Sequence, residues 1–195
     1  LSLMLNAGAL PAPLEVIEER TVDASLGQDA IESGAMASIV AGVVTLVFMV
    51  LAYGLFGVFA VLALVINFVL LLGAMSMVGA ALTLPGIAGL ILTIAMAVDA
   101  NVIIYERMRE EAAAGRAPAL AIDAGFARAM ITIIDANLTT ILAALILFQF
   151  GAGPVRGFAW TLSIGVITSV FTAVLVTQVL IAWWFRAARP KQLPI

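Results

Sequence analysis

Residues 87–105 read IAGLILTIAMAVDANVIIY, an apolar run interrupted by one acid, Asp99, and one amide, Asn101. The same tripeptide recurs 36 residues later as Asp135-Ala136-Asn137, inside a second apolar run at 131–150 that reads ITIIDANLTTILAALILFQF. Each run is close to the ~20 residues that a helix needs to cross a bilayer. A charged carboxylate near the centre of such a helix costs about 2.5 to 3.5 kcal/mol, so acids there usually mark an ion path, a proton relay or a catalytic centre.

The composition is that of an integral membrane protein. Hydrophobic residues make up 64% of the 195 residues and charged residues only 11%, and the mean hydropathy is +1.20. The sequence has no cysteine and no histidine, which excludes disulfides and thiolate metal sites and removes the usual proton carrier near pH 7. Any proton chemistry therefore falls to carboxylates. We expect no metal site, no cofactor other than protons as a coupling ion, and no nucleic-acid partner.

Five apolar runs predict five transmembrane helices and therefore an all-α fold. The breaks between them contain turn-forming residues, at 54–57, 84–86 and 151–154. Residues 1–34 mix turn formers with acids and are predicted to be soluble, followed by a transmembrane domain at 35–186 and a tail at 187–195. The five predicted spans are 35–53, 58–77, 87–105, 131–150 and 158–185.

A charged loop at 106–130 separates the third and fourth spans. Helix formers after Glu106 predict that the third helix continues past the membrane, with an Arg107–Glu111 pair on its surface and Gly115 as its stop. Pro118 predicts the start of a second, short helix that lies along the membrane surface. For the individual arginines, a solvated charged hairpin is the preferred interpretation.

The distribution of the nine basic residues predicts the orientation. Four of them lie in the 106–130 loop, and Arg186, Arg189 and Lys191 follow the last span, whereas Arg20 and Arg156 fall on the opposite side. By the positive-inside rule, the loop and the C-terminus are cytoplasmic. Five spans then place the N-terminal segment outside. The four loop arginines are Arg107, Arg109, Arg116 and Arg128.

Small residues recur every four positions on two of the predicted spans. Such series give a helix a flat face, and close backbone contact supplies much of the attraction between helices in lipid. Ordinary helix packing is the preferred interpretation, and a sliding surface is the alternative. The two series are Gly34, Ser38 and Gly42 on the first span and Gly165, Ser169 and Ala173 on the fifth.

The two buried acids are predicted to lie at different depths. Asp99 follows Pro85 by 14 residues, which places it roughly 21 Å into the membrane, whereas Asp135 lies near the cytoplasmic end of the fourth span. No predicted span contains Lys, Arg or His. Asp99 must therefore be protonated, hydrated or paired with a basic residue from another polypeptide, and it is the stronger candidate for a proton-carrying group.

Amides and hydroxyls surround both acids. We predict that a proton relay includes both acids together with these polar neighbours. The alternative is that the acids are packing or capping groups and that the neighbours hydrogen-bond across helices; a carboxylate is also welcome near a helix start, which keeps this alternative open for Asp135. The full predicted set is Asp99, Asn101, Asp135, Asn137, Thr139 and Thr140.

Several motifs follow one another along the whole chain: Ala9 to Leu14, Glu18 to Val22, Ser25 to Gly27, Leu84 to Gly89, Ala97 to Val102 with Glu106-Arg107, and Asp135 to Thr140. In this order they closely resemble the C-terminal half of the SecD family, an accessory subunit of the bacterial protein translocon. Two departures, Asn6 where an arginine is common and Asp23-Ala24 in place of Gly-Pro, both lie in the external segment.

The resemblance implies a membrane half of the RND superfamily, with five of its six helices present and residues 1–34 as the last segment of a periplasmic domain. It implies a bacterial inner-membrane protein that uses the proton-motive force to promote export of a preprotein through the SecYEG channel. SecF is the implied partner, and YajC, YidC and membrane lipid are further expected contacts. Asp99 matches the acid of the family's fourth helix that is associated with proton transport, Asp135 matches the second motif acid, and SecF would supply an arginine as counter-charge.

Two other function classes compete with this interpretation. Aspartates on adjacent membrane helices can form a protease dyad that shares one proton. Such proteases resemble one another through a Gly-x-Gly-Asp motif, whereas here Asp99 follows Met96-Ala97-Val98 and Asp135 follows Ile133-Ile134. A purely structural scaffold of the translocon would make both acids dispensable.

Overall fold

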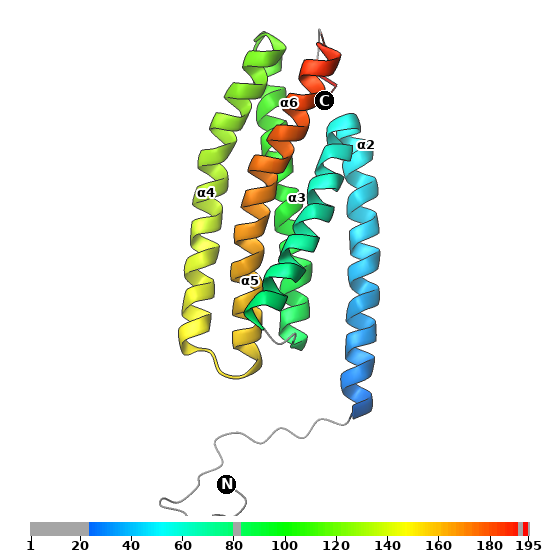
Figure 1. Ribbon diagram of the computed structural model, residues 1–195, viewed down its shortest axis with the longest axis vertical. Coiled ribbons are helices and arrows are strands. Elements are labelled where there is room, and N and C mark those ends of the chain that lie inside the picture. Colours follow the sequence, from blue (N-terminus) through cyan, green and yellow to red (C-terminus); the bar gives the residue numbers. More distant parts are fainter. Residues whose placement is uncertain (1–23, 80–82, 191–192, 195) are drawn as a thin grey trace, which may run out of the picture.

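The computed structural model describes residues 24–79, 83–190 and 193–194, and within them every regular element is a helix (Figure 1). The predicted all-α membrane fold is confirmed. Most of the predicted soluble segment at 1–34 lies outside the described residues. The elements are α2 (Ala24–Val78), α3 (Leu84–Ala113), α4 (Pro118–Phe150), α5 (Pro154–Phe171), the π-helical turn η1 (Thr172–Val176) and α6 (Thr177–Ala188).

The long helix α2 is two helices joined by a reversal at Gly54. Gly54 has φ 53° and ψ −122°, the conformation of the second residue of a type II′ turn, which favours glycine. Figure 1 shows α2 rising to this point and then descending beside itself. We call the two halves the first arm (24–53) and the second arm (55–78). Because of the reversal, α2 provides two apolar helical segments instead of one.

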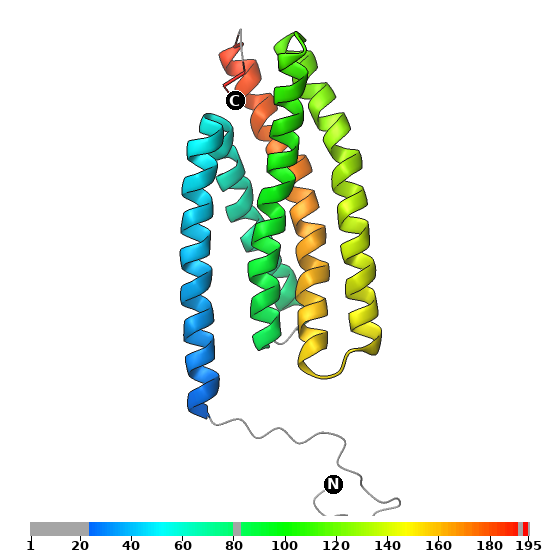
Figure 2. The same cartoon turned by 180° about the vertical axis from the view of Figure 1, so that it is seen from behind.

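Four stretches of helix are long and apolar enough to cross a membrane in the described part of the chain. They are Glu32–Val78, Leu84–Ala113, Pro118–Phe150 and Pro154–Ala188. The first contains the Gly54 reversal, so the described part of the chain has five segments that can span a membrane. Figure 2 shows α3 flanked by the first arm on one side and by α4 on the other.

The turn residues end and start the helices where the sequence predicts. Pro85 lies in the first turn of α3, and Gly115, with φ 83°, follows the end of that helix. The sequence analysis missed the N-cap: the Thr83 hydroxyl oxygen accepts a hydrogen bond from the Gly86 amide at 3.2 Å, and the hydroxyl donates to the Pro154 carbonyl at 3.2 Å. Thr83 therefore also ties the start of α3 to the start of α5.

The prediction of a separate surface helix after Pro118 is wrong. Pro118 starts α4, which continues without interruption to Phe150, so only 114–117 separate α3 from α4. The apolar residues of this first part do not face a membrane surface. Ile122 and Phe126 are buried, and a Cβ atom on Gly125 would overlap the backbone and side chain of Met108 on α3. Burial against α3 holds this part of α4 alongside α3 as a continuation of the same helix.

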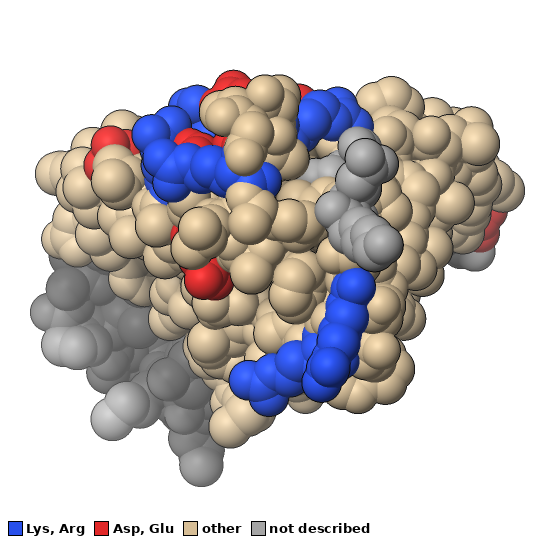
Figure 3. Space-filling model, turned by 90° about the horizontal axis from the view of Figure 1, so that it is seen from above, with Lys and Arg blue, Asp and Glu red and all other residues tan. Residues whose placement is uncertain are grey.

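The predicted Arg107–Glu111 pair is also wrong. Arg107 pairs with Glu110 at 2.7 Å on the surface. The Glu111 side chain is only 4% exposed, and its two oxygens pair with Arg116 at 2.7 Å and with Arg128 at 2.6 Å. We call these three residues the Glu111 cluster. It joins the end of α3 to α4, and Figure 3 shows charged residues gathered at this end of the molecule.

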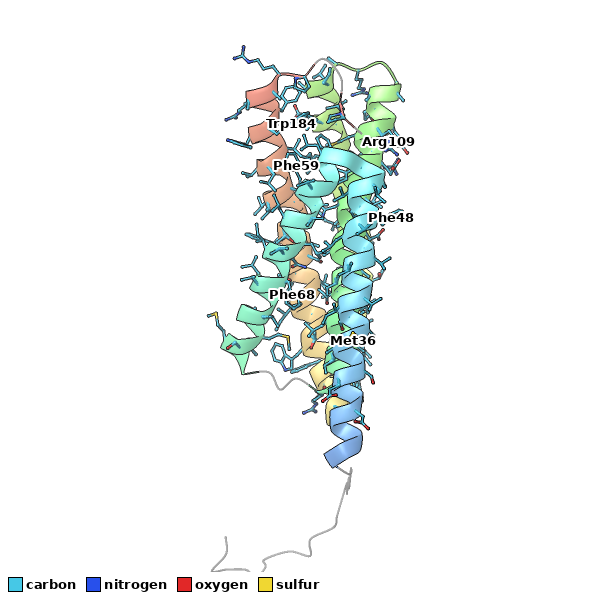
Figure 4. The ribbon with its side chains drawn as sticks, turned by 90° about the vertical axis from the view of Figure 1, so that its right-hand side faces the viewer. Met36, Phe48, Phe59, Phe68, Arg109 and Trp184 are labelled. Atoms are coloured by element: carbon cyan, nitrogen blue, oxygen red, sulfur yellow. The ribbon has the colours of Figure 1, made fainter. Side chains whose placement is uncertain are left out.

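An aromatic cluster ties the Gly54 reversal to α3 and α6. Tyr53 and Phe56, on either side of the reversal, each lie 5.5 Å from Tyr105 between ring centroids, and Phe56 lies 5.5 Å from Trp184. Figure 4 shows Phe59 of the second arm beside Trp184 at this end. These large buried rings dominate the packing here.

Polar contacts also join Tyr53 of the aromatic cluster to the end of α3. The Tyr53 hydroxyl donates to Glu106 Oε1 at 3.0 Å, and Arg109 Nη1 donates to the same oxygen at 2.8 Å. The Arg109 guanidinium also lies 5.4 Å from the centre of the Tyr53 ring, within the range of a cation–π contact. The end of the first arm is therefore fixed to α3 by rings and charges together.

We expect Gly54→Ala to destabilise the protein by about 1–3 kcal/mol, because a side chain is strained in this backbone conformation. Thermal unfolding in detergent measures the change. Gly73→Ala is the matched control: Gly73 lies within the second arm and a Cβ atom there has nothing within 4 Å, so its substitution should not lower the melting temperature. An equal loss of stability in the two variants would contradict this account of the reversal.

In the Glu111 cluster, removing the acid should destabilise the protein less than removing both arginines. The two arginine side chains are 48% and 60% exposed, so Glu111→Gln leaves hydrated cations and costs about 1 kcal/mol. The double variant Arg116→Ala/Arg128→Ala leaves a buried, unpaired carboxylate and should cost about 3–5 kcal/mol.

Unfolding by heat or denaturant compares these variants with Arg107→Ala. Arg107 belongs to an exposed pair, so its loss should change stability by less than about 1 kcal/mol. A double variant no less stable than Glu111→Gln would show that the buried carboxylate does not need its arginines.

Candidate functional site

A polar groove lies between α3 and α4 at the height of the two Asp-Ala-Asn tripeptides. Its volume is about 170 Å³. Residues from both helices form it, and polar groups come from each side. The lining residues are Met96, Asp99, Ala100 and Ile103 of α3 and Ile133, Ala136, Asn137 and Thr140 of α4.

Asp99 is the carboxylate of this groove. Its side chain is exposed, and it forms no hydrogen bond or ion pair with any residue that the structure describes. The carboxylate thus lies in the middle of an apolar helix without a partner from its own bundle. Such a group requires water, a proton or a cation from outside the described chain.

Asp135 does not share the groove. It is exposed, does not line the cavity, and likewise has no polar partner among the described residues. Ala136 and Asn137, which follow it, face α3 instead. Side chains two positions apart on an α-helix point about 200° away from each other around the helix axis. Asp135 therefore points away from α3 when Asn137 points toward it.

The two tripeptides use opposite faces of their helices. In the first copy the acid faces the groove and the amide is buried, because Asn101 is 2% exposed on the other side of α3. In the second copy the amide, Asn137, faces the groove and the acid is outside it. One acid and one amide thus meet in the groove, although the sequence repeat alone suggests two facing acids.

Asn101 forms the one hydrogen bond of the predicted set that crosses between helices. Its Oδ1 atom accepts from the Thr177 hydroxyl at 2.7 Å, and its Nδ2 atom donates to the Ala97 carbonyl at 3.0 Å. Thr177 begins α6 directly after η1. The alternative in which the polar neighbours bond across helices therefore describes Asn101.

The other three polar neighbours bond to carbonyls of their own helix. Asn137 donates to Ile133 at 2.7 Å, and both Thr139 and Thr140 donate to Ala136, at 2.8 and 3.2 Å. The amide oxygen of Asn137 accepts no hydrogen bond from the described residues. It can accept one from a protonated carboxyl group in the groove. Thr139 is exposed and does not line the groove.

The two small-residue series lie in different surroundings. On the fifth span, Gly165, Ser169 and Ala173 are buried, and a Cβ atom on Gly165 would overlap the side chain of Thr93 on α3. This series is a close helix contact. Helix α3 packs more extensively against α5 than against any other element.

The first-span series is more open. A Cβ atom on Gly34 would lie 3.6 Å from Ile87, whereas one on Gly42 would have nothing within 4 Å. Gly42 instead borders an apolar hollow between the first arm, the second arm and Ile94 of α3. Ser38 donates to the Gly34 carbonyl of its own helix at 2.7 Å. This series brings the arm near α3 at one end only.

Neither the bond of Thr177 to Asn101 nor the burial of Glu111 was predicted from the sequence. Thr177 had a signal: it continues the four-residue spacing of Gly165, Ser169 and Ala173. Glu111 had no signal that separates it from Glu110, because both lie in one charged run and only the packing of α4 buries one of them.

Comparison with known proteins agrees with this architecture. The family described as "Protein export membrane protein SecD/SecF, C-terminal" matches residues 6–187. The chain belongs to the SecD/SecF family. The match covers all five spanning segments and both tripeptides, so the family resemblance seen in the sequence is confirmed.

Named relatives match the chain from end to end. It is 54% identical to the protein translocase subunit SecD of Syntrophobacter fumaroxidans and 52% identical to that of Acetobacter pasteurianus, in each case over the whole chain and 37% of the relative. It is 48% identical to the protein translocase subunit SecDF of Brucella abortus, covering 26% of that protein. The chain thus spans little more than a third of the SecD relatives and about a quarter of the SecDF relative.

Solved structures of SecDF share the helix arrangement. The crystal structure of SecDF from Thermus thermophilus, a translocon-associated membrane protein, matches 97% of the chain with a TM-score of 0.88 and 41% identity. A second SecDF structure, in the super-membrane-facing form, matches with a TM-score of 0.78 and 44% identity. The chain covers 27% and 26% of those two chains.

Proposed function

We propose that the chain is the C-terminal membrane part of a protein-export subunit that uses the proton-motive force to promote translocation, with Asp99 as the proton-carrying group. The observation that supports this role is an exposed, unpartnered carboxylate in a polar groove midway along an apolar helix. Acids in this setting mark ion paths or proton relays. Protons are the coupling ion of the proposal, and the subunit is a transport component, not an enzyme.

Asn137 and Thr140 are proposed to assist Asp99. Both line the same groove from α4. The free amide oxygen of Asn137 is suited to accept a hydrogen bond from Asp99 when that carboxyl is protonated. When Asp99 is ionised, Asn137 offers its amide hydrogens instead. The groove therefore supports both protonation states with groups from one neighbouring helix.

A second polypeptide is proposed to complete the site. Asp99 is exposed, and α4 presents the apolar residues Ile131, Leu138 and Leu142 on its uncovered side. SecF, with an arginine as counter-charge, is the proposed partner, either as a separate chain or as the other half of a fused protein such as the SecDF relative. SecYEG, the translocating preprotein, YajC and YidC are proposed to join the same assembly in the bacterial inner membrane.

The proposed orientation places the end that carries the Glu111 cluster in the cytoplasm. Arg107, Arg109, Arg116 and Arg128 lie at this end, together with Arg186 in the last turn of α6. The turn between α4 and α5 and the start of the first arm lie at the other end (Figure 1). The positive-inside rule supports this assignment, and the N-terminal segment is then periplasmic.

The geometry disfavours a protease dyad. A dyad needs two carboxyl groups close enough to share a proton, whereas the groove contains Asp99 and leaves out Asp135. A structural scaffold without a proton role remains the outcome against which the proposal is tested.

Asp99→Asn in the full-length subunit should abolish the stimulation of preprotein export by a proton gradient while leaving insertion and assembly with SecF intact. Amide and carboxyl have nearly the same size, so the groove should keep its shape while losing the group that binds a proton. Export into inverted membrane vesicles, with and without a gradient, measures the effect. Asp135→Asn is the matched control and should retain at least half of the stimulation.

Proton flux in liposomes, with and without SecF, gives the second readout for these variants. Normal stimulation and flux in the Asp99→Asn variant would refute the motor and favour the scaffold. Cleavage of a membrane peptide that is lost in both variants would favour the protease.

A further inference from the structure

Six buried positions follow one face of α5, η1 and α6 at intervals of four residues. The first five are glycine or residues with small or polar side chains, and the last is an isoleucine. None of the six is more than 1% exposed where a value is given, and Gly165 is also buried. The positions are Thr161, Gly165, Ser169, Ala173, Thr177 and Ile181.

Helix α3 presents a matching series. Gly89, Thr93, Ala97 and Asn101 are buried and also recur every four residues. The two helices run in the same direction (Figure 1), and members of the two series pair in order along them. A Cβ atom added to Gly89 would crowd Thr161, and one added to Gly165 would overlap Thr93. Farther along the two helices, Thr177 bonds to Asn101.

A continuous α-helix cannot hold a four-residue series on one face. Four residues turn about 400°, so the series drifts by about 40° at each step and by about 200° over the five steps from Thr161 to Ile181. The π turn η1 at 172–176 takes up one extra residue and so sets the following residues back by about 100°. About half of the drift is removed, and Thr177 again faces α3.

The Thr177 hydroxyl differs from the hydroxyls before it on the same helix. Thr161, Thr168 and Ser169 donate to carbonyls of their own helix. Thr177 has a long contact of this kind, 3.5 Å to the Thr172 carbonyl, but its short bond is to Asn101 Oδ1 at 2.7 Å, between side chains that are 0% and 2% exposed. A buried bond between side chains of two helices fixes their relative rotation.

We propose that Thr177, held toward α3 by the π turn η1, is the positioning residue that aims Asp99 into its groove. Asn101 follows Asp99 by two positions, so a bond on the Asn101 side of α3 sets the direction of Asp99 on the opposite side. This inference rests on the proposed function of Asp99. The test below separates the failure of one from the failure of the other.

The experiment uses full-length subunit with SecF in proteoliposomes and measures export at several applied proton gradients. Thr177→Val keeps the shape and removes the hydroxyl. We expect the gradient-dependent part of export to fall about fivefold, the worth of a typical hydrogen bond, while export without a gradient stays near wild type. The melting temperature should fall modestly, because the buried Asn101 Oδ1 atom loses its donor. Thr177→Ser, which restores a donor, should recover most of the gradient dependence.

Thr161→Val is the matched control. Thr161 is buried on the same face but its hydroxyl bonds to the Gly157 carbonyl of its own helix, so its removal should leave the gradient dependence unchanged. A purely structural role for Thr177 would instead reduce export with and without a gradient in equal proportion. That result, or normal gradient dependence in Thr177→Val, would overturn the proposal.

Two further comparisons complete the test. Asp99→Asn that loses gradient dependence, together with an unaffected Thr177→Val, would refute the positioning role and leave the proposed function standing. Asp99→Asn with normal gradient dependence would refute the proposed function itself. If Thr177→Val does not assemble, Thr177→Ala repeats the comparison without added bulk; failure of both to assemble would show that the hydroxyl serves folding and would also overturn the proposal.

Discussion

The close contact between α3 and α5 is the constraint on which the rest of the structure depends. Hydrophobic burial does not drive helices together in lipid, so their attraction comes from close packing and hydrogen bonds. Gly165 beside Thr93 and Gly89 beside Thr161 bring the two backbones together. Because α3 is held on this side, its opposite side is left to α4 and to the groove that contains Asp99.

This arrangement explains why two identical tripeptides place different side chains in the groove. The about 200° between the acid and the amide of each copy forces a choice of which faces the neighbouring helix. Helix α3 buries Asn101 toward α6 and turns Asp99 to the groove, whereas α4 turns Asn137 to the groove and Asp135 away from it. The repeat in sequence is therefore not a symmetric pair of sites in space.

The sequence predicts the elements well where local chemistry decides them. Gly54 marks the reversal, Gly115 follows the end of α3, and Pro85 and Pro154 lie at helix starts. The prediction fails at 106–130, where Pro118 and the apolar residues after it suggested a separate surface helix. Contacts of Ile122 and Phe126 with α3, which join residues distant in sequence, decide that α4 stays continuous.

For the candidate site too, the sequence predicts some features, and others depend on how the helices pack. The prediction that Asp99 has a function follows from composition, because an acid in an apolar run without basic residues is costly. Its position in the groove, the outward position of Asp135 and the bond between Thr177 and Asn101 depend on helix rotation, which no local pattern fixes. The π turn adds a change of register that hydropathy alone does not reveal.

Infrared titration of the full-length complex with SecF in lipid tests the central claim most directly, because the C=O stretch of a protonated carboxyl group reports proton binding itself. The account predicts that a pH change produces a carboxyl band that disappears in Asp99→Asn and persists in Asp135→Asn. A band that survives in Asp99→Asn and is lost in Asp135→Asn would contradict it.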